Sequence, residues 1–422
     1  MKKSILAVLL ILSLLLSGCG QAKNDSSAAQ SGFSAPVYTG GFPSNRRASD
    51  GFDHSHFDAA VLGGVLGENS VLNSSAAEGN HLLSPANLYL SLASLSYLTE
   101  GTSRSQLLQV LGASQLTEME TNLQTLWNSQ FYKTNDALCL LGNSMWISDS
   151  LSVPAARLTE LSEKYYTASY VGRPGTEAFN NSYREWLSSM TGGLLEKETS
   201  QAVLDPDMAL QVASTLYYQA QFSEPFEAAR TSSQTFHAPS GDVNVPMMHM
   251  DEAFPYHQDD LFDAAGLSLM NGATLWILLP KDNVTPAALC SSEAVITWLK
   301  SPSCEQEDLV LSVPQFDISD HVPLIDVMKG LGAGDIFDPD LADFSGLSDD
   351  ISGCFVTRFE QTLRIRLSEG GIESASYTEA VIISAAAPED AVSFTADRPF
   401  LFALRDFDGT ILFAGIVNDP SR

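Results

Sequence analysis

Residues 369 to 388 read Glu369-Gly370-Gly371-Ile372-Glu373-Ser374-Ala375-Ser376-Tyr377-Thr378-Glu379-Ala380-Val381-Ile382-Ile383-Ser384-Ala385-Ala386-Ala387-Pro388. Small residues dominate the segment, as in a surface loop, and the Gly-Gly pair makes a permissive hinge before it. The residues nevertheless alternate like a strand with one buried face. The even-numbered positions from Ile372 to Ile382 carry no charge, whereas Glu373, Tyr377 and Glu379 share the other face. This pattern predicts two states, an exposed loop and an inserted strand; the alternative is a static loop whose alternation is incidental.

Strand-like segments lie on both sides of this loop. Leu363, Ile365 and Leu367 alternate before it. After it, two apolar runs at 400–404 and 411–416 flank Asp408-Gly409, a hairpin turn signal. Earlier strands are predicted at 209–218, 274–279 and 309–313.

The N-terminal half is rich in helix signals. Ser84 followed by Pro85 is typical of an N-cap with proline in the first helical position, and the helix should extend toward Gly101. Shorter helices are predicted at 103–111 and 183–190. The mixture predicts a single α+β domain over residues 51–422, with large sheets and helices on one side.

The sequence lacks the usual marks of an active site. It contains no GxSxG, HExxH, Walker or GxGxxG motif. His54 and His56 have no third metal ligand nearby in the sequence, and His249 between two methionines is interpreted as structural. We therefore expect a protein that is not an enzyme and uses no cofactor or metal.

The first residues read as an export signal. Lys2 and Lys3 precede an apolar run from Ile5 to Leu16, which is short for a membrane span, and Ser17-Gly18 precede Cys19. This arrangement resembles a bacterial lipoprotein signal, which predicts a leader at 1–18 and lipidation of Cys19. An ordinary secretory signal with a chance cysteine is the alternative. Residues 19–50 are rich in small and polar residues and read as a flexible tether.

The net charge bears on the partners of the protein, and the cysteines on a possible disulfide. The net charge of −29 falls by two, to −31, when Lys2 and Lys3 leave with the leader. Such acidity argues against nucleic acid as a partner and favours encounter with basic proteins, although it can also serve solubility alone. Cys290 and Cys304 are close enough in sequence to form a disulfide, but free thiols are an equal alternative.

Several motifs, in order over residues 52 to 420, resemble the serpin family. The family's hinge pattern is matched by Glu369, Gly370, Gly371, Ile372, Glu373, Ser374, Ala375 and Ser376. Trp186-Leu187 with Thr191 and Gly193 resembles another family pattern, and Asp397-Arg398-Pro399-Phe400 resembles its C-terminal signature. Further matches are Leu83-Ser84-Pro85, Val245-Pro246-Met247-Met248, Val313-Pro314-Gln315-Phe316 and Ala342-Asp343-Phe344-Ser345-Gly346.

The resemblance implies a fold of about eight to nine helices and three β-sheets with an exposed reactive-centre loop. It also implies a suicide inhibitor of serine endopeptidases. The protease forms an acyl-enzyme with the loop, and the cut loop inserts into the central sheet and distorts the enzyme. Ile372 replaces the usual Thr or Ser at the first inserting position. The residues implied for the sheet-opening region are Ser84, Asn87, Ser214, Phe222 and Gln361, of which Ser214, Phe222 and Gln361 depart from the family's Asn, Trp and His.

The resemblance also implies where the loop is cut. Sixteen positions past Glu369 lies Ala385, which gives the bond Ala385–Ala386. Counting back from Pro399 points further along, so Ile383, Ser384 and Ala387 remain alternatives. Since Arg366 and Arg398 enclose a stretch without Lys or Arg, trypsin-like targets are disfavoured.

Small apolar residues near the bond favour elastase-like targets, with subtilisin-like enzymes as the second choice. The other reading is a non-inhibitory serpin-like binding protein, because of the substitutions in the hinge and the sheet-opening region. We expect an exported monomer, held on the extracellular face of the cell membrane through Cys19, with release from the membrane as the alternative.

Overall fold

The computed structural model describes residues 79–191, 193, 195, 200–348, 351, 353–372 and 391–422. The predicted leader, Cys19, the tether, and His54 with His56 lie outside the described residues. So do positions 373–390, which include Glu373, Ser374, Ala375, Ser376 and the predicted bond near Ala385–Ala386.

The described part of the chain contains eight α-helices. They are α4 (Pro85–Leu98), α5 (Gly101–Val110), α6 (Leu116–Gln130), α7 (Ala155–Tyr165), α8 (Glu177–Met190), α10 (Pro286–Cys290), α11 (Glu293–Lys300) and α12 (Ile325–Gly330). Two short 3-10 helices, η2 (Ala228–Arg230) and η3 (Asp335–Phe337), accompany them.

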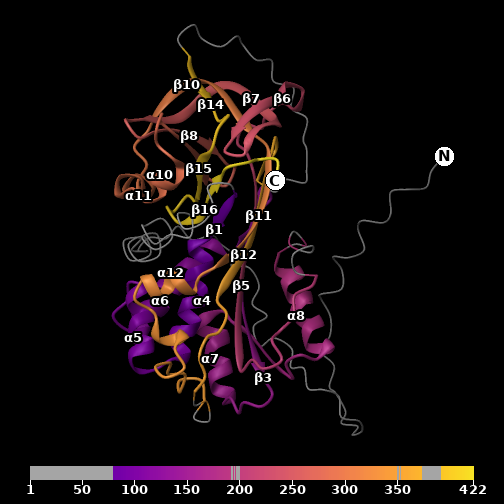
Figure 1. The fold of residues 1–422 in the computed structure, drawn as a ribbon, viewed down its shortest axis with the longest axis vertical. Helices are drawn as coiled ribbons and strands as arrows, with labels where there is room; N and C mark the ends of the chain where they lie inside the picture. The colour runs from indigo at the N-terminus through magenta and orange to yellow at the C-terminus, as the bar shows by residue number, and fades with distance from the viewer. Residues whose placement is uncertain are drawn as a thin grey trace, which may run out of the picture. The chain divides into compact units, whose positions relative to one another are not determined.

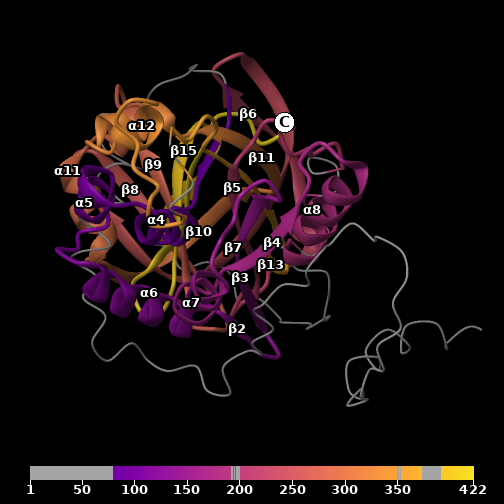
Figure 2. The ribbon, with the colours of Figure 1, turned by 90° about the horizontal axis from the view of Figure 1, so that it is seen from below.

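One sheet has seven strands among the described residues and contains the start of the hinge. Its order is β11 (Phe316–Pro323), β12 (Glu360–Ser368), β13 (Gly371–Ile372), β5 (Leu210–Gln221), β3 (Ala137–Ser148) and β2 (Tyr132–Lys133), with β4 (Ala168–Gly172) paired to β3. Helices α4 and α7 lie to one side of β5 and β3 and α8 to the other, as Figures 1 and 2 show.

The other sheet has nine strands. Its order is β1 (His81–Leu83), β16 (Ile411–Val417), β15 (Phe400–Arg405), β9 (Thr274–Pro280), β8 (Phe262–Ser268), β7 (Gly241–Gln258), β10 (Glu305–Pro314) and β14 (Val392–Thr395), with β6 (Ser232–Ala238) paired to β7. The α+β class is confirmed. The described strands join into two sheets where three were expected, because the 18-residue strand β7 pairs with β6 near its start and with β8 at its end.

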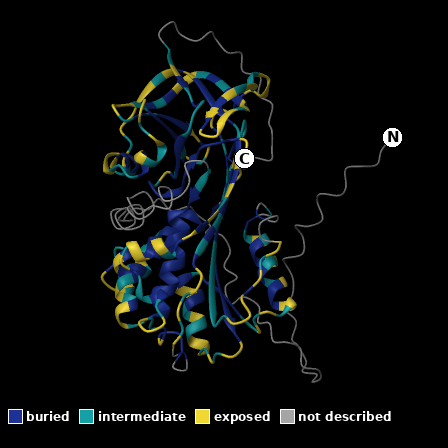
Figure 3. Cartoon of the chain, in the orientation of Figure 1, coloured by how far each residue is buried: buried dark blue, intermediate teal, exposed yellow. Residues whose placement is uncertain are grey.

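The predicted elements form close to their expected positions. Ser84 caps α4, its hydroxyl accepting the N–H of Asn87 at 3.2 Å, and Pro85 follows. All fourteen residues of α4 are buried, so this helix is a core element on every face. Figure 3 shows it in the buried colour throughout. It ends at Leu98, three residues before Gly101, because the cap Thr99 is extended.

Two further predictions can be compared with the structure. Helix α8 starts at Glu177, earlier than the predicted 183, because its buried stripe already begins at Phe179. The hairpin between β15 and β16 is confirmed, and Gly409 in its turn has a φ of 96°, a conformation that favours glycine. None of the helices in the described ranges has the length and apolarity needed to cross a membrane.

Candidate functional site

The described half of the hinge lies inside the seven-stranded sheet. Strand β13 pairs antiparallel with β12 on one side, Leu367 opposite Ile372, and with β5 on the other, Ala220 opposite Ile372. Ile372 is only 1% exposed and belongs to the main hydrophobic core. The chain has therefore begun to enter the sheet at Gly371–Ile372, where sequence analysis placed the first inserting residue.

Glu369 and Gly370 hold the turn that leads into β13. The carbonyl of Gly370 accepts the N–H of Phe222 at 3.0 Å, and the carbonyl of Glu369 accepts the N–H of Phe226 at 2.9 Å. The Glu369 carboxylate accepts a hydrogen bond from the Thr231 hydroxyl at 2.9 Å. Phe222 thus lies at the hinge, 3% exposed, with its ring edge-on to Phe226.

Gly371 is a position that the geometry restricts to glycine. Its φ is +136°, and a Cβ there would overlap the carbonyl oxygen of Ala220 and lie 2.9 Å from the Cα of Gln221. We expect Gly371→Ala to displace β13 from the sheet and to lower the free energy of unfolding by about 2 kcal/mol. Denaturant unfolding measures this, with Gly353→Ala as control: Gly353 also has positive φ, 73°, but has open space around it. Equal effects of the two changes would contradict the role of the close approach.

Beyond Gly371–Ile372, no described strand pairs with the facing edges of β5 and β12, and we call the space between these edges the gap. The ladder from β13 reaches only residues 220–221 of β5 and 367–368 of β12. The first five residues of β5 are half-buried, whereas the last eight of its other neighbour β3 are buried. Among the residues that the structure describes, the facing edges of these two long strands have no strand partner beyond Ile372, which is the geometry that accepts one more strand.

The N-terminal part of α4 forms the floor of this gap and is hydrogen-bonded to both β12 and β5. On the β12 side, the Gln361 amide exchanges two hydrogen bonds with the backbone of Ser84, Ser84 N to Oε1 at 3.2 Å and Nε2 to Ser84 O at 3.0 Å. On the β5 side, the Ser214 hydroxyl bonds to the side chains of Asn87 and Ser91, the latter at 2.6 Å. Four of the five predicted sheet-opening residues thus meet at the gap floor, and Phe222 lies apart at the hinge.

Two polar atoms at the gap have no hydrogen-bond partner within the described residues. They are Nδ2 of Asn87, on the α4 side, and the hydroxyl oxygen of Thr215, on the α8 side. Asn87 is 1% exposed and Thr215 is 3% exposed, so neither is well placed to bond to solvent. Buried polar groups are normally satisfied. Their presence indicates that this form of the sheet leaves donors for something else.

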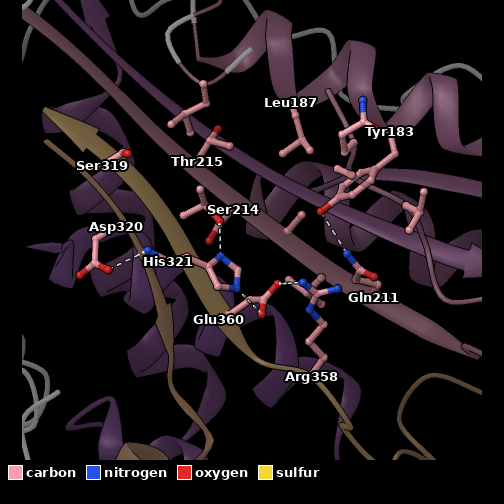
Figure 4. Close-up of a pocket in the computed structure, with 17 residues that line it drawn as sticks. Tyr183, Leu187, Gln211, Ser214, Thr215, Ser319, Asp320, His321, Arg358 and Glu360 are labelled. Atoms are coloured by element: carbon pink, nitrogen blue, oxygen red, sulfur yellow. Dashed lines mark hydrogen bonds and ion pairs between the residues drawn. The ribbon is translucent and has the colours of Figure 1, made fainter. Parts of the chain in front are cut away.

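On the other face the gap opens into a cavity of about 680 Å³ beneath α8. Figure 4 shows Tyr183 and Leu187 of α8 above it, Gln211 and Thr215 of β5 beside it, and His321 of β11 with Glu360 of β12 across it. The Tyr183 hydroxyl accepts a hydrogen bond from Gln211 at 3.0 Å, and burial raises the pKa of Tyr183 to about 12.

Charged side chains at the cavity are paired with one another. The Glu360 carboxylate lies 2.8 Å from His321 Nε2 and 2.5 Å from Arg358, and the hydrogen bond that Arg358 donates to it raises the pKa of Arg358. Further along β12, Arg364 and Arg366 both hold Asp317; the Arg364 bond is the chief cause of the lowered Asp317 pKa. These pairs are partly exposed and add little stability; two of their cations, Arg364 and Arg366, belong to β12.

Sequence reasoning missed Ser91, His321, Arg358 and Glu360 at this site. Ser91 could have been found, because it lies four residues after Asn87 and so on the same helix face. The other three come from separate segments that only the sheet brings together.

The cysteines, His249 and the potential metal ligands can also be compared with the structure. None of the four described cysteines forms a disulfide, so the pairing of Cys290 with Cys304 is not seen; Cys290 is buried, Cys304 is exposed, and burial raises the pKa of Cys290 to about 12. His249 bonds to Ser312 at 2.8 Å and to Gln234 at 3.0 Å, a structural arrangement between strands. No group of three or more potential metal ligands converges among the described side chains.

The sequence is similar to a protein-family model and to individual proteins of known family. The family model described as Serpin (serine protease inhibitor) matches residues 69–420. Plasminogen activator inhibitor 1 of Neovison vison is 27% identical, covering 81% of this chain and 87% of that protein. Serpin-Z2A of Oryza sativa subsp. japonica is 25% identical, covering 81% and 92%.

Solved structures show the same fold. The native form of tengpin, described as a thermophilic serpin, superposes with a TM-score of 0.78 at 20% identity, covering 87% of this chain and 94% of tengpin. The native stressed form of Arabidopsis AtSerpin1 gives a TM-score of 0.75 at 21% identity, covering 90% and 100%.

Proposed function

This chain belongs to the serpin family, a family of protease inhibitors and not of catalysts, and from that premise we propose that it inhibits elastase-like serine endopeptidases. In this proposal the protease is trapped as an acyl-enzyme when the cut loop enters the central sheet. The observation that carries the proposal is the gap between β5 and β12, with Ile372 already seated at its end. Inhibition needs both a loop that can be cut and a place for it to insert.

The register of β13 supports insertion of the following residues. If both ladders continue, each even-numbered residue after Ile372 faces α4 and each odd-numbered one faces α8. Thr378 then falls between Ser214 and Gln361, directly over Asn87. Its hydroxyl can accept the hydrogen bond that Asn87 Nδ2 lacks in the present form.

The positions of the charged residues in the loop are compatible with insertion in this register. Glu373 falls beside Arg366 of β12, on the exposed face of the sheet, where Arg366 already pairs with Asp317. The face that becomes buried carries no charge from Ile372 to Ile382. Burying an unpaired carboxylate there would cost several kcal/mol, about 3–5. Insertion is therefore allowed on electrostatic grounds.

The choice of target rests on the residues around Ala385–Ala386. A small apolar pocket accepts alanine, whereas a trypsin-like pocket requires a cation that the stretch between Arg366 and Arg398 lacks. The net charge of −29 favours encounter with a basic protease through electrostatic steering. A subtilisin-like protease is the second candidate, because its specificity also tolerates small residues.

The experiment is incubation with pancreatic elastase followed by denaturing electrophoresis. We expect a heat-stable covalent complex and a released C-terminal peptide, whose mass identifies the bond among residues 383–387. Clean cleavage without a complex would instead support a non-inhibitory protein.

A substitution at the bait residue tests the specificity. Ala385→Arg supplies the cation that pairs with the acid of a trypsin-like pocket, and we expect the rate of complex formation with trypsin to rise at least 100-fold while that with elastase falls. Second-order rate constants for both enzymes measure this. Ala387→Arg is the matched control. If Ala387→Arg raised the rate with trypsin and Ala385→Arg did not, the protease would cut after residue 387 and not after residue 385.

We also propose that the protein is exported and held at the outer face of the cell membrane by acyl chains on Cys19. The mass of the mature N-terminal peptide tests this. An unmodified cysteine, or cleavage elsewhere, would contradict it.

A further inference from the structure

The cavity beneath α8 is bounded by the helix on one side and by the strands of the sheet on the other. It measures about 680 Å³ and is roofed by Tyr183 and Leu187. The lining also includes Thr215 of β5 and Thr362 of β12, so the cavity extends from the edges of the gap to the helix. The cavity is in the size range of sites that hold a ligand or a large side chain.

The lining has two kinds of surface. Leu187, Leu195, Ala202, Val203 and Ala213 make an apolar part, and Val203 is 54% exposed although it is a large hydrophobic residue. Gln211, His321 and Thr362 make a polar part on the strands. Thr215 lies on the same lining, and its buried hydroxyl oxygen has no hydrogen-bond partner in the described part of the chain. An occupant with an apolar body and a polar end fits this division, and tyrosine has both.

The register brings one such side chain to this place. Strand β13 pairs Ile372 with Ala220 and with Leu367. If both ladders continue for five more residues, position 377 lies opposite Thr215 on β5 and Thr362 on β12. Both of these residues line the cavity. Because Ile372 points into the core on the α4 side, position 377 has the opposite direction and points toward α8.

The residue at that position is Tyr377, the only aromatic residue among the eighteen between Ile372 and Ala391. The neighbouring odd-numbered positions carry Ala375 and Glu379, which cannot fill an apolar space of this size. The length of the segment is sufficient, since Tyr377 lies only five residues beyond the last residue of β13.

We propose that Tyr377 occupies the cavity beneath α8 in the loop-inserted form and fixes the register of the inserted strand against Leu187. This inference rests on the proposed function, since it concerns the state that the cut loop reaches. The ring of Tyr377 stabilises the loop-inserted form because it is buried only when the inserted strand and α8 are both in place. A shift by one residue would turn Tyr377 to the α4 side, where α4 is buried and packed on all faces.

The test compares the full chain before and after cutting with thermolysin, a metalloprotease that forms no acyl-enzyme. In the cleaved protein we expect Tyr377→Ala to lower the guanidinium midpoint of unfolding by about 0.3–0.5 M, and Tyr377→Phe to lower it much less. In the uncleaved protein both changes should leave the midpoint unchanged. Ala375→Gly, on the same face but outside the cavity, is the control and should have a smaller effect than Tyr377→Ala.

A double-mutant cycle with Leu187→Ala identifies the contact. The effects of Tyr377→Ala and Leu187→Ala should be non-additive in the cleaved protein and additive in the uncleaved one. If cleavage raises the midpoint of the unmutated protein but Tyr377→Ala leaves that gain intact, or the two changes add, this inference is overturned while the proposed function stands. If cleavage brings no gain even in the unmutated protein, insertion itself fails.

Discussion

Cutting the loop within residues 383–387 should raise the midpoint of thermal unfolding by roughly 10–20 °C. The residues from Ile372 to Ile382 would form a new central strand along the edges of β5 and β12, which have no partner there among the described residues. Each new backbone hydrogen bond contributes a net 0.5–1.5 kcal/mol, so that after the ordering of the loop the gain is on the order of 10 kcal/mol. The uncut form is then held by a kinetic barrier and not by its equilibrium stability.

Calorimetry of the protein before and after cutting with thermolysin measures this gain. A useful comparison is the same protein cut in its predicted tether, residues 19–50, which lies outside the serpin domain. That cut should leave the midpoint unchanged. An equal or lower midpoint after loop cleavage would mean that the gap does not accept the loop.

Placing a single charge on the face that becomes buried should abolish trapping. Continued register puts Ala380 opposite Val212 and Phe359, which pack in or against the core, so Ala380→Glu buries an unpaired carboxylate at a cost of about 3–5 kcal/mol. The insertion step slows while hydrolysis of the acyl-enzyme does not. We expect the ratio of covalent complex to cleaved product with elastase to fall at least tenfold.

The matched control is the same chemical change on the other face. Ala375→Glu would lie opposite Tyr217 and beside Arg364, so its carboxylate stays near solvent and a cation. It should retain the ratio of complex to cleaved product within about twofold. If both variants trap elastase equally, the alternation of the loop has no role in insertion.

Local features of the chain were largely predictable from the sequence. The cap at Ser84, the hairpin turn at Asp408-Gly409 and the alternation of 363–367 each depend on residues a few positions apart. Helix caps, turns and strand periodicity are set by such short-range geometry. The buried direction of Ile372 also follows from its own period-two pattern, and the structure places it in the core as predicted.

The arrangement of the sheets could not be obtained in this way. The expected third sheet is absent from the described residues because β7 continues for 18 residues and pairs at both of its ends. Strand length can be read only approximately from a pattern, and pairing depends on which distant strands compete for each edge.

What the sequence by itself determined was the loop: a hinge at Gly370-Gly371, an uncharged face from Ile372 to Ile382, and a stretch without cations around Ala385. Only the tertiary structure decided what that face can meet. The bond between Gln361 and Ser84 joins residues 277 positions apart, and the cavity beneath α8 gathers side chains from α8, β5, β11 and β12. A face is a property of consecutive residues, whereas a gap is the space left between strands that pack against the same helix, and no local pattern encodes it.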